Sequence, residues 1–121
     1  MHFILSYAKK PLTTNAERAG NRWARASSVR EWREAFASIA KEEGVPAMAW
    51  INVTVQPFQK RGPLQDTAAC NPAAKAAIDG LVDAGVVPDD TGDYVRQITF
   101  LPCVRGDDQL TIIIQGVRED A

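Results

Sequence analysis

Several short stretches of the chain alternate apolar and polar residues at the two-residue period of a β-strand. Residues 2–7 carry Phe3, Leu5 and Tyr7 on one side. Residues 47–56 continue the same pattern over a longer stretch, which Pro57 ends. The predicted core face of this second strand is Ala47, Ala49, Ile51, Val53 and Val55, with Trp50, Asn52 and Thr54 opposite.

Two further strands are predicted near the C-terminus, at residues 94–104 and 109–117. The turn sequence Arg105-Gly106-Asp107-Asp108 between them predicts an antiparallel hairpin. In the last strand Ile112 and Ile114 point one way, and Ile113 and Val117 the other. Apolar residues on both sides indicate a central strand or one covered on both faces.

Helical spacing of apolar residues predicts two main helices. In residues 29–43 the apolar side chains fall on one face, Ser28 and Glu31 resemble a capping box, and Gly44 provides a stop. In residues 72–84 Asn71 is the expected N-cap and Pro72 the first helical residue. The many alanines of this helix permit close approach to a sheet or to a partner chain.

Residues 8–27 and 57–70 are predicted to be loops, the first pinned to the body by Trp23. The expected order is strand, loop, helix, strand, loop, helix, strand, strand. At 121 residues the chain is expected to be one small α/β (α+β) domain over 1–121, with a mixed four-stranded sheet.

Composition limits the classes of protein and the cellular locations that fit this chain. No apolar run approaches the roughly 18 residues that a membrane helix needs, and the N-terminus lacks the apolar region of a signal peptide. Cys70 and Cys103 make neither a disulfide framework nor a zinc motif. We therefore expect a protein without a membrane partner, located in a reducing intracellular compartment.

Charge is distributed unevenly although the net charge is only −1. Residues 1–62 hold ten Lys/Arg and five Asp/Glu, whereas residues 63–121 hold four and ten. This asymmetry favours a phosphate-binding face beside an acidic, metal-binding one, although a short chain can also acquire it by chance. The basic residues of the first part include Arg18, Arg22, Arg25, Lys60 and Arg61.

Aspartates are the main candidates for chemistry, because His2 is the only histidine and there is no Gly-rich phosphate loop. They surround the second predicted helix: Asp66 before it, Asp79 and Asp83 on it, and Asp89 and Asp90 after it. Carboxylate oxygens are the ligands that Mg²⁺ and Mn²⁺ prefer. The simpler interpretation of Asp89 and Asp90 is ordinary turn chemistry.

Lys75 stands one helical turn before Asp79. The simpler interpretation is a surface ion pair worth a few tenths of a kcal/mol. The functional interpretation is that Lys75 stabilises phosphate charge in a transition state.

The segment from Asn71 to Asp90, with Lys75, Asp79, Gly85 and Asp89-Asp90 at their spacing, resembles the signature of RusA-like Holliday junction resolvases. The region from Pro11 through Asn15 to Trp32-Arg33 is similar to that family's N-terminal part. The resemblance covers nearly the whole chain, with its specific motif between about residues 66 and 90.

The resemblance implies a homodimeric, Mg²⁺-dependent enzyme that resolves four-way DNA junctions by paired nicks. It implies that Asp66, Asp89 and Asp90 bind the metal, that Asp66 and Asp90 act in catalysis, and that Lys75 is the catalytic lysine. Mn²⁺ is the expected substitute metal. Such a protein acts in DNA recombination and repair in the cytoplasm of a bacterial or phage-infected cell. The residues that the resemblance leads us to expect at the DNA are Asn15, Arg18, Arg22, Arg25, Lys60 and Arg61.

One departure from the family pattern is Cys70, which falls where a second aspartate of the acidic loop is expected. A thiol is a poor ligand for magnesium. Three alternatives follow. Either Asp66 does the work of both aspartates of the acidic loop, or Asp79 contributes to the metal site, or the chain binds branched DNA and cleaves it poorly. A weaker alternative is a structural protein that dimerises through its alanine-rich helix.

Overall fold

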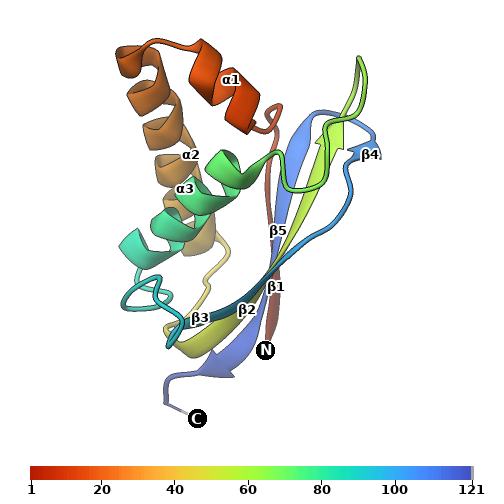
Figure 1. Ribbon diagram of the computed structural model, residues 1–121. Coiled ribbons are helices and arrows are strands. Elements are labelled where there is room, and N and C mark those ends of the chain that lie inside the picture. The colour runs from red at the N-terminus through yellow and green to blue at the C-terminus, as the bar shows by residue number, and fades with distance from the viewer. Residues whose placement is uncertain (121) are drawn as a thin grey trace.

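One mixed sheet, with helices packed against one of its faces, forms the body of the protein (Figure 1). The computed structural model describes residues 1–120. The elements are β1 His2–Tyr7, α1 Thr14–Ala19, α2 Arg22–Glu42, β2 Met48–Gln59, α3 Asn71–Asp83, β3 Val95–Phe100, β4 Val104–Arg105 and β5 Gln109–Arg118. The predicted α/β class, mixed sheet and two main helices are confirmed.

The sheet has five strands, because the short β4 adds to the four that were predicted. Its order is β1-β5-β2-β3, with β4 paired to the end of β2. β5 is antiparallel to β1 and β2, whereas β3 and β4 are parallel to β2. The predicted hairpin of residues 94–104 with 109–117 is therefore wrong. β2 lies between β3 and β5. The connection from β2 to β3 runs through α3, so β3 lies beside β2 in the parallel direction.

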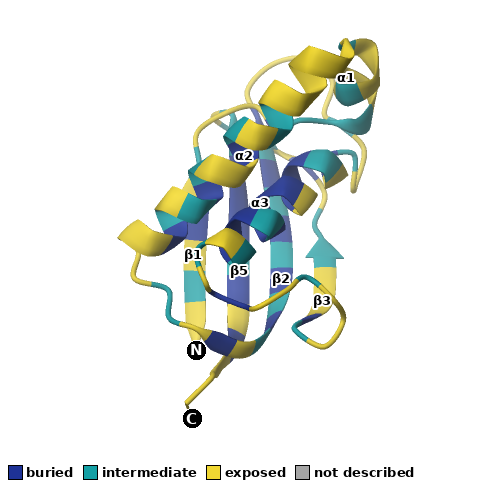
Figure 2. Ribbon diagram, turned by 90° about the vertical axis from the view of Figure 1, so that its left-hand side faces the viewer, coloured by how far each residue is buried: buried dark blue, intermediate teal, exposed yellow. Residues whose placement is uncertain are grey.

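The core lies between the sheet and the helices α2 and α3 (Figure 2). Trp32 and Phe36 of α2 are fully buried. The ring of Tyr7 packs edge-on against that of Trp32, with 5.1 Å between the ring centroids. From α3 the chain buries Ala73, Ala74, Ala76, Ala77, Ile78 and Leu81. The alanine-rich face thus packs within its own chain, so it is not free for a partner.

The predicted loop over residues 8–27 is wrong, because α1 and the first turns of α2 occupy much of it. Asn21 caps α2 by accepting a hydrogen bond from the Ala24 amide at 2.8 Å, so Ser28 lies inside the helix and is no cap. Glu31 instead accepts a hydrogen bond from the Tyr7 hydroxyl at 2.7 Å. Trp23 does not pin this segment, since it is 83% exposed.

Other predicted boundaries shift by small amounts with clear causes. β2 continues through Pro57 to Gln59, where it pairs with β4 and β5. Its pairing with β5 shifts register between Met48 and Trp50, which leaves Ala47 and Ala49 exposed rather than in the core. Cys70, not Asn71, is the N-cap residue of α3 and gives no side-chain cap.

Only one face of the sheet is covered by helices. β5 is central, as predicted, but Val117 on its other face is 40% exposed. Ile4 and Ile98 are also exposed. Within residues 1–120, no helix combines the length and apolar character required to span a membrane.

Candidate functional site

Lys75 lies between two carboxylates that come from different parts of the chain. Its ammonium donates to Asp79 Oδ1 at 3.1 Å and also forms an ion pair with Asp90. Asp79 is one turn further along α3, whereas Asp90 belongs to the loop that folds back beneath α3 (Figure 2). The structure thus brings together three of the predicted site residues.

The loop after α3 is built to hold Asp90 in place. Gly85 ends the helix in the left-handed region at φ 81°, a conformation that favours glycine. Val86 and Val87 are then fully buried and anchor the loop to the core. Asp89 accepts a hydrogen bond from the Asp90 amide through Oδ1 at 2.8 Å, so its side chain orients the backbone at Asp90.

Mutual attraction favours the charged forms of Lys75 and Asp90. The hydrogen bond to Asp90 is the main cause of a raised pKa for Lys75; burial opposes it and Asp79 reinforces it. The hydrogen bond from Lys75 and the charge of its ammonium lower the pKa of Asp90. All three side chains remain partly accessible to solvent, so the site is open to a ligand from outside.

Asp66 occupies a tight turn before α3. Its carbonyl accepts the Ala69 amide at 3.0 Å, and Ala68 adopts the left-handed region at φ 68°, which is uncommon for a residue other than glycine. The Ala69 carbonyl in turn accepts the amide of Thr14, which ties the turn to α1. The side chain of Asp66 is exposed to solvent.

Cys70, at the position where the family resemblance implies an aspartate, belongs to the core. Its side chain is fully buried, and this burial raises the pKa of the thiol to about 11. A neutral buried thiol has no affinity for a hard cation such as magnesium. Cys70 therefore makes no ligand to such a metal.

The predicted metal ligands are only partly assembled. Among residues 1–120, no three His, Cys, Asp or Glu side chains form a group able to hold a metal ion, and Asp66 joins no such group. Asp79 and Asp90 do converge on Lys75. Mg²⁺ often binds through one or two carboxylates and keeps several waters, so this pair offers oxygens of the type that the ion prefers, although Lys75 occupies the place between them.

Asp83, the other aspartate on α3, has a different partner that sequence reasoning did not identify. Arg33 of α2 donates two hydrogen bonds to it, at 2.6 and 2.8 Å. This paired geometry links α2 to α3 on the surface. It removes Asp83 from the candidate chemistry.

The predicted DNA-binding residues are all exposed and come from two regions. Asn15, Arg18, Arg22 and Arg25 lie on α1 and the first turn of α2, and Lys60 and Arg61 lie just after β2. Gln59, which is buried, shapes the second region by donating to the carbonyls of Arg61 and Pro63 at 2.6 and 2.8 Å. The sequence did not identify Gln59, because it stands among polar residues of a predicted loop and no pattern there indicates that its amide is buried.

A hollow of about 370 Å³ lies between these regions. Its lining includes Lys9, Lys10, Trp32 and Gln65. The amide nitrogen and oxygen of Gln65 are buried there without a hydrogen-bond partner in the described chain. No sequence pattern indicated this hollow, which depends on segments far apart in the chain.

Comparison with protein-family models and with curated proteins found no match to this chain.

Proposed function

We propose that the protein is a metal-dependent, structure-selective endonuclease that cuts branched DNA, as its resemblance to the RusA-like resolvases implies. The observation that carries the proposal is the ammonium of Lys75 held between the carboxylates of Asp79 and Asp90. Metal-dependent phosphodiester hydrolysis uses acidic oxygens to hold a cation and a positive charge beside the phosphate, and this group contains both.

Each residue of the group has a distinct part in this proposal. Asp79 and Asp90 would hold Mg²⁺ or Mn²⁺, which when bound supplies polarisation of the phosphoryl oxygen and a nucleophilic hydroxide. Lys75 would contact the phosphate and stabilise the negative charge that grows there. Asp89 would position Asp90 by accepting the hydrogen bond from the Asp90 backbone amide. Asp66 lies on an exposed turn before α3, from which its side chain would have to reach the site.

The basic residues would grip the DNA backbone. Lys60 and Arg61 follow β2, and Arg18, Arg22 and Arg25 line α1 and the start of α2. Contacts of this kind set the position and salt dependence of binding and carry no sequence information. Paired nicks on opposing strands need two sites, so we also propose that the chain acts as a homodimer.

The experiment is cleavage of a labelled four-way junction with and without Mg²⁺, using wild type, Asp90→Asn and Asp93→Asn. Asp93 is an exposed aspartate of the same loop and serves as the matched control. We expect paired nicks from wild type and Asp93→Asn, and a loss of at least about 100-fold in Asp90→Asn. Absence of Mg²⁺-dependent cleavage by wild type, or unchanged cleavage by Asp90→Asn, rejects the nuclease proposal.

A second candidate function is binding of branched DNA without cleavage. The observation that favours it is the buried, neutral thiol of Cys70 at a position where a metal ligand is expected. This candidate predicts junction binding in EDTA that weakens with salt and with Lys60→Gln and Arg61→Gln, and no nicking with either metal. Nicking that depends on Asp90 excludes it.

A further inference from the structure

Trp23 is the most exposed of the large apolar side chains in the described chain, at 83%. It lies in the first turn of α2. The other two tryptophans have partners within the fold: Trp32 is buried in the core, and Trp50 lies under Arg96, whose guanidinium is 4.7 Å from its ring centroid. Trp23 therefore contributes nothing to the core.

The surface around Trp23 is strongly basic. Residues 14–30 contain four arginines and one acidic residue, Glu17. The arginines are exposed, and no ion pair within residues 1–120 involves them; they are Arg18, Arg22, Arg25 and Arg30. The next charged residues along α2 differ, because Glu31 pairs with Lys9 and Arg33 with Asp83.

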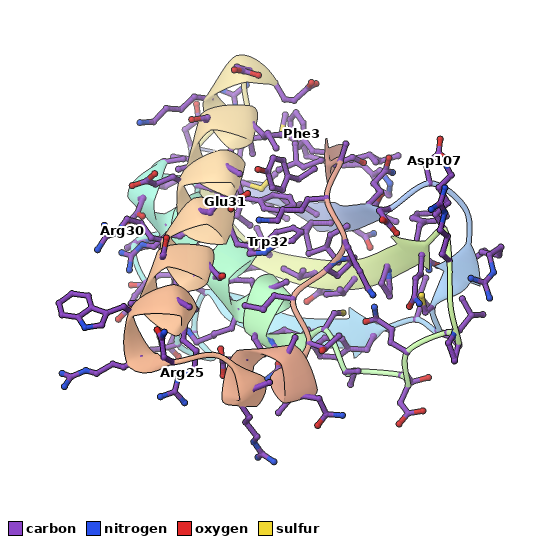
Figure 3. The ribbon with its side chains drawn as sticks, turned by 90° about the horizontal axis from the view of Figure 1, so that it is seen from above. Phe3, Arg25, Arg30, Glu31, Trp32 and Asp107 are labelled. Atoms are coloured by element: carbon purple, nitrogen blue, oxygen red, sulfur yellow. The ribbon has the colours of Figure 1, made fainter. Side chains whose placement is uncertain are left out.

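Helix geometry places part of this charge beside the indole. Arg30 lies two turns from Trp23 on the same side of α2, and Arg22 is its neighbour in sequence. Arg25 and Arg30 both project from α2 away from the sheet (Figure 3). Hydrogen bonds to the side chains of Thr13 and Asn21 cap the first turns of α1 and α2, next to Trp23.

The charge decides which partner this surface fits. A second copy of the same patch would oppose arginine to arginine across a two-fold axis, which is unfavourable. An anionic membrane would need an apolar helix face, but the residues that share the exposed side with Trp23 are Ala26, Ser27, Arg30 and Glu34, of which Ala26 alone is apolar. A nucleic acid meets both features, since phosphates pair with arginines and an unpaired base stacks on an indole.

We infer that Trp23 is a stacking platform for an unpaired DNA base, with the surrounding arginines holding the phosphates on either side. This deepens the proposed function, on which it rests for the choice of DNA, by naming the part of a branched substrate that this corner binds: an open or frayed strand. Fully paired duplex offers no free base face, so it engages only the arginines.

The experiment uses the full chain in EDTA, where no cleavage can occur. Tryptophan fluorescence and fluorescence anisotropy are followed during titration with a 15-nucleotide oligo-dT, a blunt duplex of that length and a four-way junction. The variants are Trp23→Ala, Trp23→Phe and, as a control for the other partly accessible indole, Trp50→Phe. Thermal unfolding checks that each variant is folded.

We expect oligo-dT to quench wild-type fluorescence and to bind the Trp23→Ala variant roughly 5- to 100-fold more weakly. Trp23→Phe should keep most of the affinity, and Trp50→Phe should match wild type. Duplex affinity should depend on salt and hardly change in Trp23→Ala. Unchanged oligo-dT binding in Trp23→Ala overturns the inference.

Two other outcomes would give the surface around Trp23 a different partner and so overturn the inference. Self-association that Trp23→Ala abolishes in sedimentation, without an effect on oligo-dT binding, makes it a contact between copies. Binding to phosphatidylserine vesicles that needs Trp23, without oligo-dT binding, makes it a membrane contact. Trp23-dependent binding in a protein that never nicks a junction rejects only the nuclease proposal.

Discussion

At the scale of single residues, the central feature is that Lys75 occupies the place between Asp79 and Asp90. The ammonium neutralises the same oxygens that a divalent cation would bind. Under the proposed function a metal and Lys75 would compete for the two carboxylates, while a phosphate would draw Lys75 toward itself. Metal and DNA are thus expected to assemble the site together.

Lys75→Ala separates these two effects. Removing the competing positive charge should raise Mn²⁺ affinity, whereas losing the charge beside the phosphate should slow junction cleavage by about 100-fold or more. Calorimetric titration of Mn²⁺ and single-turnover cleavage measure the two quantities, and Lys41→Ala at an exposed helix end is the control. Weaker Mn²⁺ binding in Lys75→Ala would contradict the competition.

Glu31 illustrates a residue whose importance the sequence concealed. It was expected to cap a helix, but it accepts hydrogen bonds from Lys9 and Tyr7, which lower the pKa of its carboxyl in that order of effect. A depressed pKa in the folded state stabilises the protein above the unfolded pKa of about 4.3, and the stabilisation is lost as pH falls through the folded value.

Glu31→Gln should therefore lower the free energy of unfolding at neutral pH. The difference from wild type should shrink as pH falls below about 4. Urea unfolding at several pH values measures this, with Glu34→Gln, an exposed glutamate of α2, as the control. A difference that does not vary with pH would contradict the account.

At the scale of elements, sequence patterns predicted what lies within each helix and strand better than where it begins. The core face of α2 was evident from the spacing of Trp32 and Phe36. Its first turns were not evident, because residues 22–27 are exposed and carry no apolar stripe. The strand β3 was predicted, but its parallel pairing with β2 was not. A turn-like sequence predicts a hairpin wherever two strands follow closely, whereas strand order depends on contacts across the whole sheet.

The contact between α2 and α3 depends on a glycine. A Cβ added to Gly80 would lie 2.3 Å from the Arg33 carbonyl oxygen and 2.9 Å from the Ala37 amide nitrogen. Both neighbours are backbone atoms, so the helices would have to separate. This glycine permits the close packing that places Lys75 and Asp79 above the sheet.

Gly80→Ala is expected to lower the free energy of unfolding by about 1–3 kcal/mol or more despite the better helix propensity of alanine. Gly92→Ala is the matched control, because an added Cβ there meets nothing within 4 Å. Denaturant unfolding of both variants measures the difference. Equal stability of Gly80→Ala and wild type would show that the helices can adjust.

The candidate site was predictable to the extent that its residues are close in the chain. Lys75 and Asp79 share a helix face by spacing alone, and Asp90 lies in the next loop. The exposure of Asp66 and the burial of Cys70 depend on the turn that Ala68 and Thr14 fix, and no local pattern shows that turn.

At the scale of the whole molecule, the predicted DNA-binding residues gather at one end of the fold, where Asp108 also accepts a hydrogen bond from the Lys60 amide. α1, the start of α2 and the loop after β2 lie at the end opposite the chain termini (Figure 1). α3 begins near this basic end and leads away from it to the loop that carries Asp89 and Asp90. A DNA strand gripped at the basic end could follow α3 toward the carboxylates.

The most direct test of the central claim is the location of a bound divalent ion. A crystal of the protein soaked in Mn²⁺ and measured for anomalous scattering would show which carboxylates bind. We predict an ion held by Asp79 and Asp90, with Lys75 displaced from between them. An ion bound elsewhere, for example at Asp107 and Asp108, with the ion pairs of Lys75 intact, would contradict the assignment of this site.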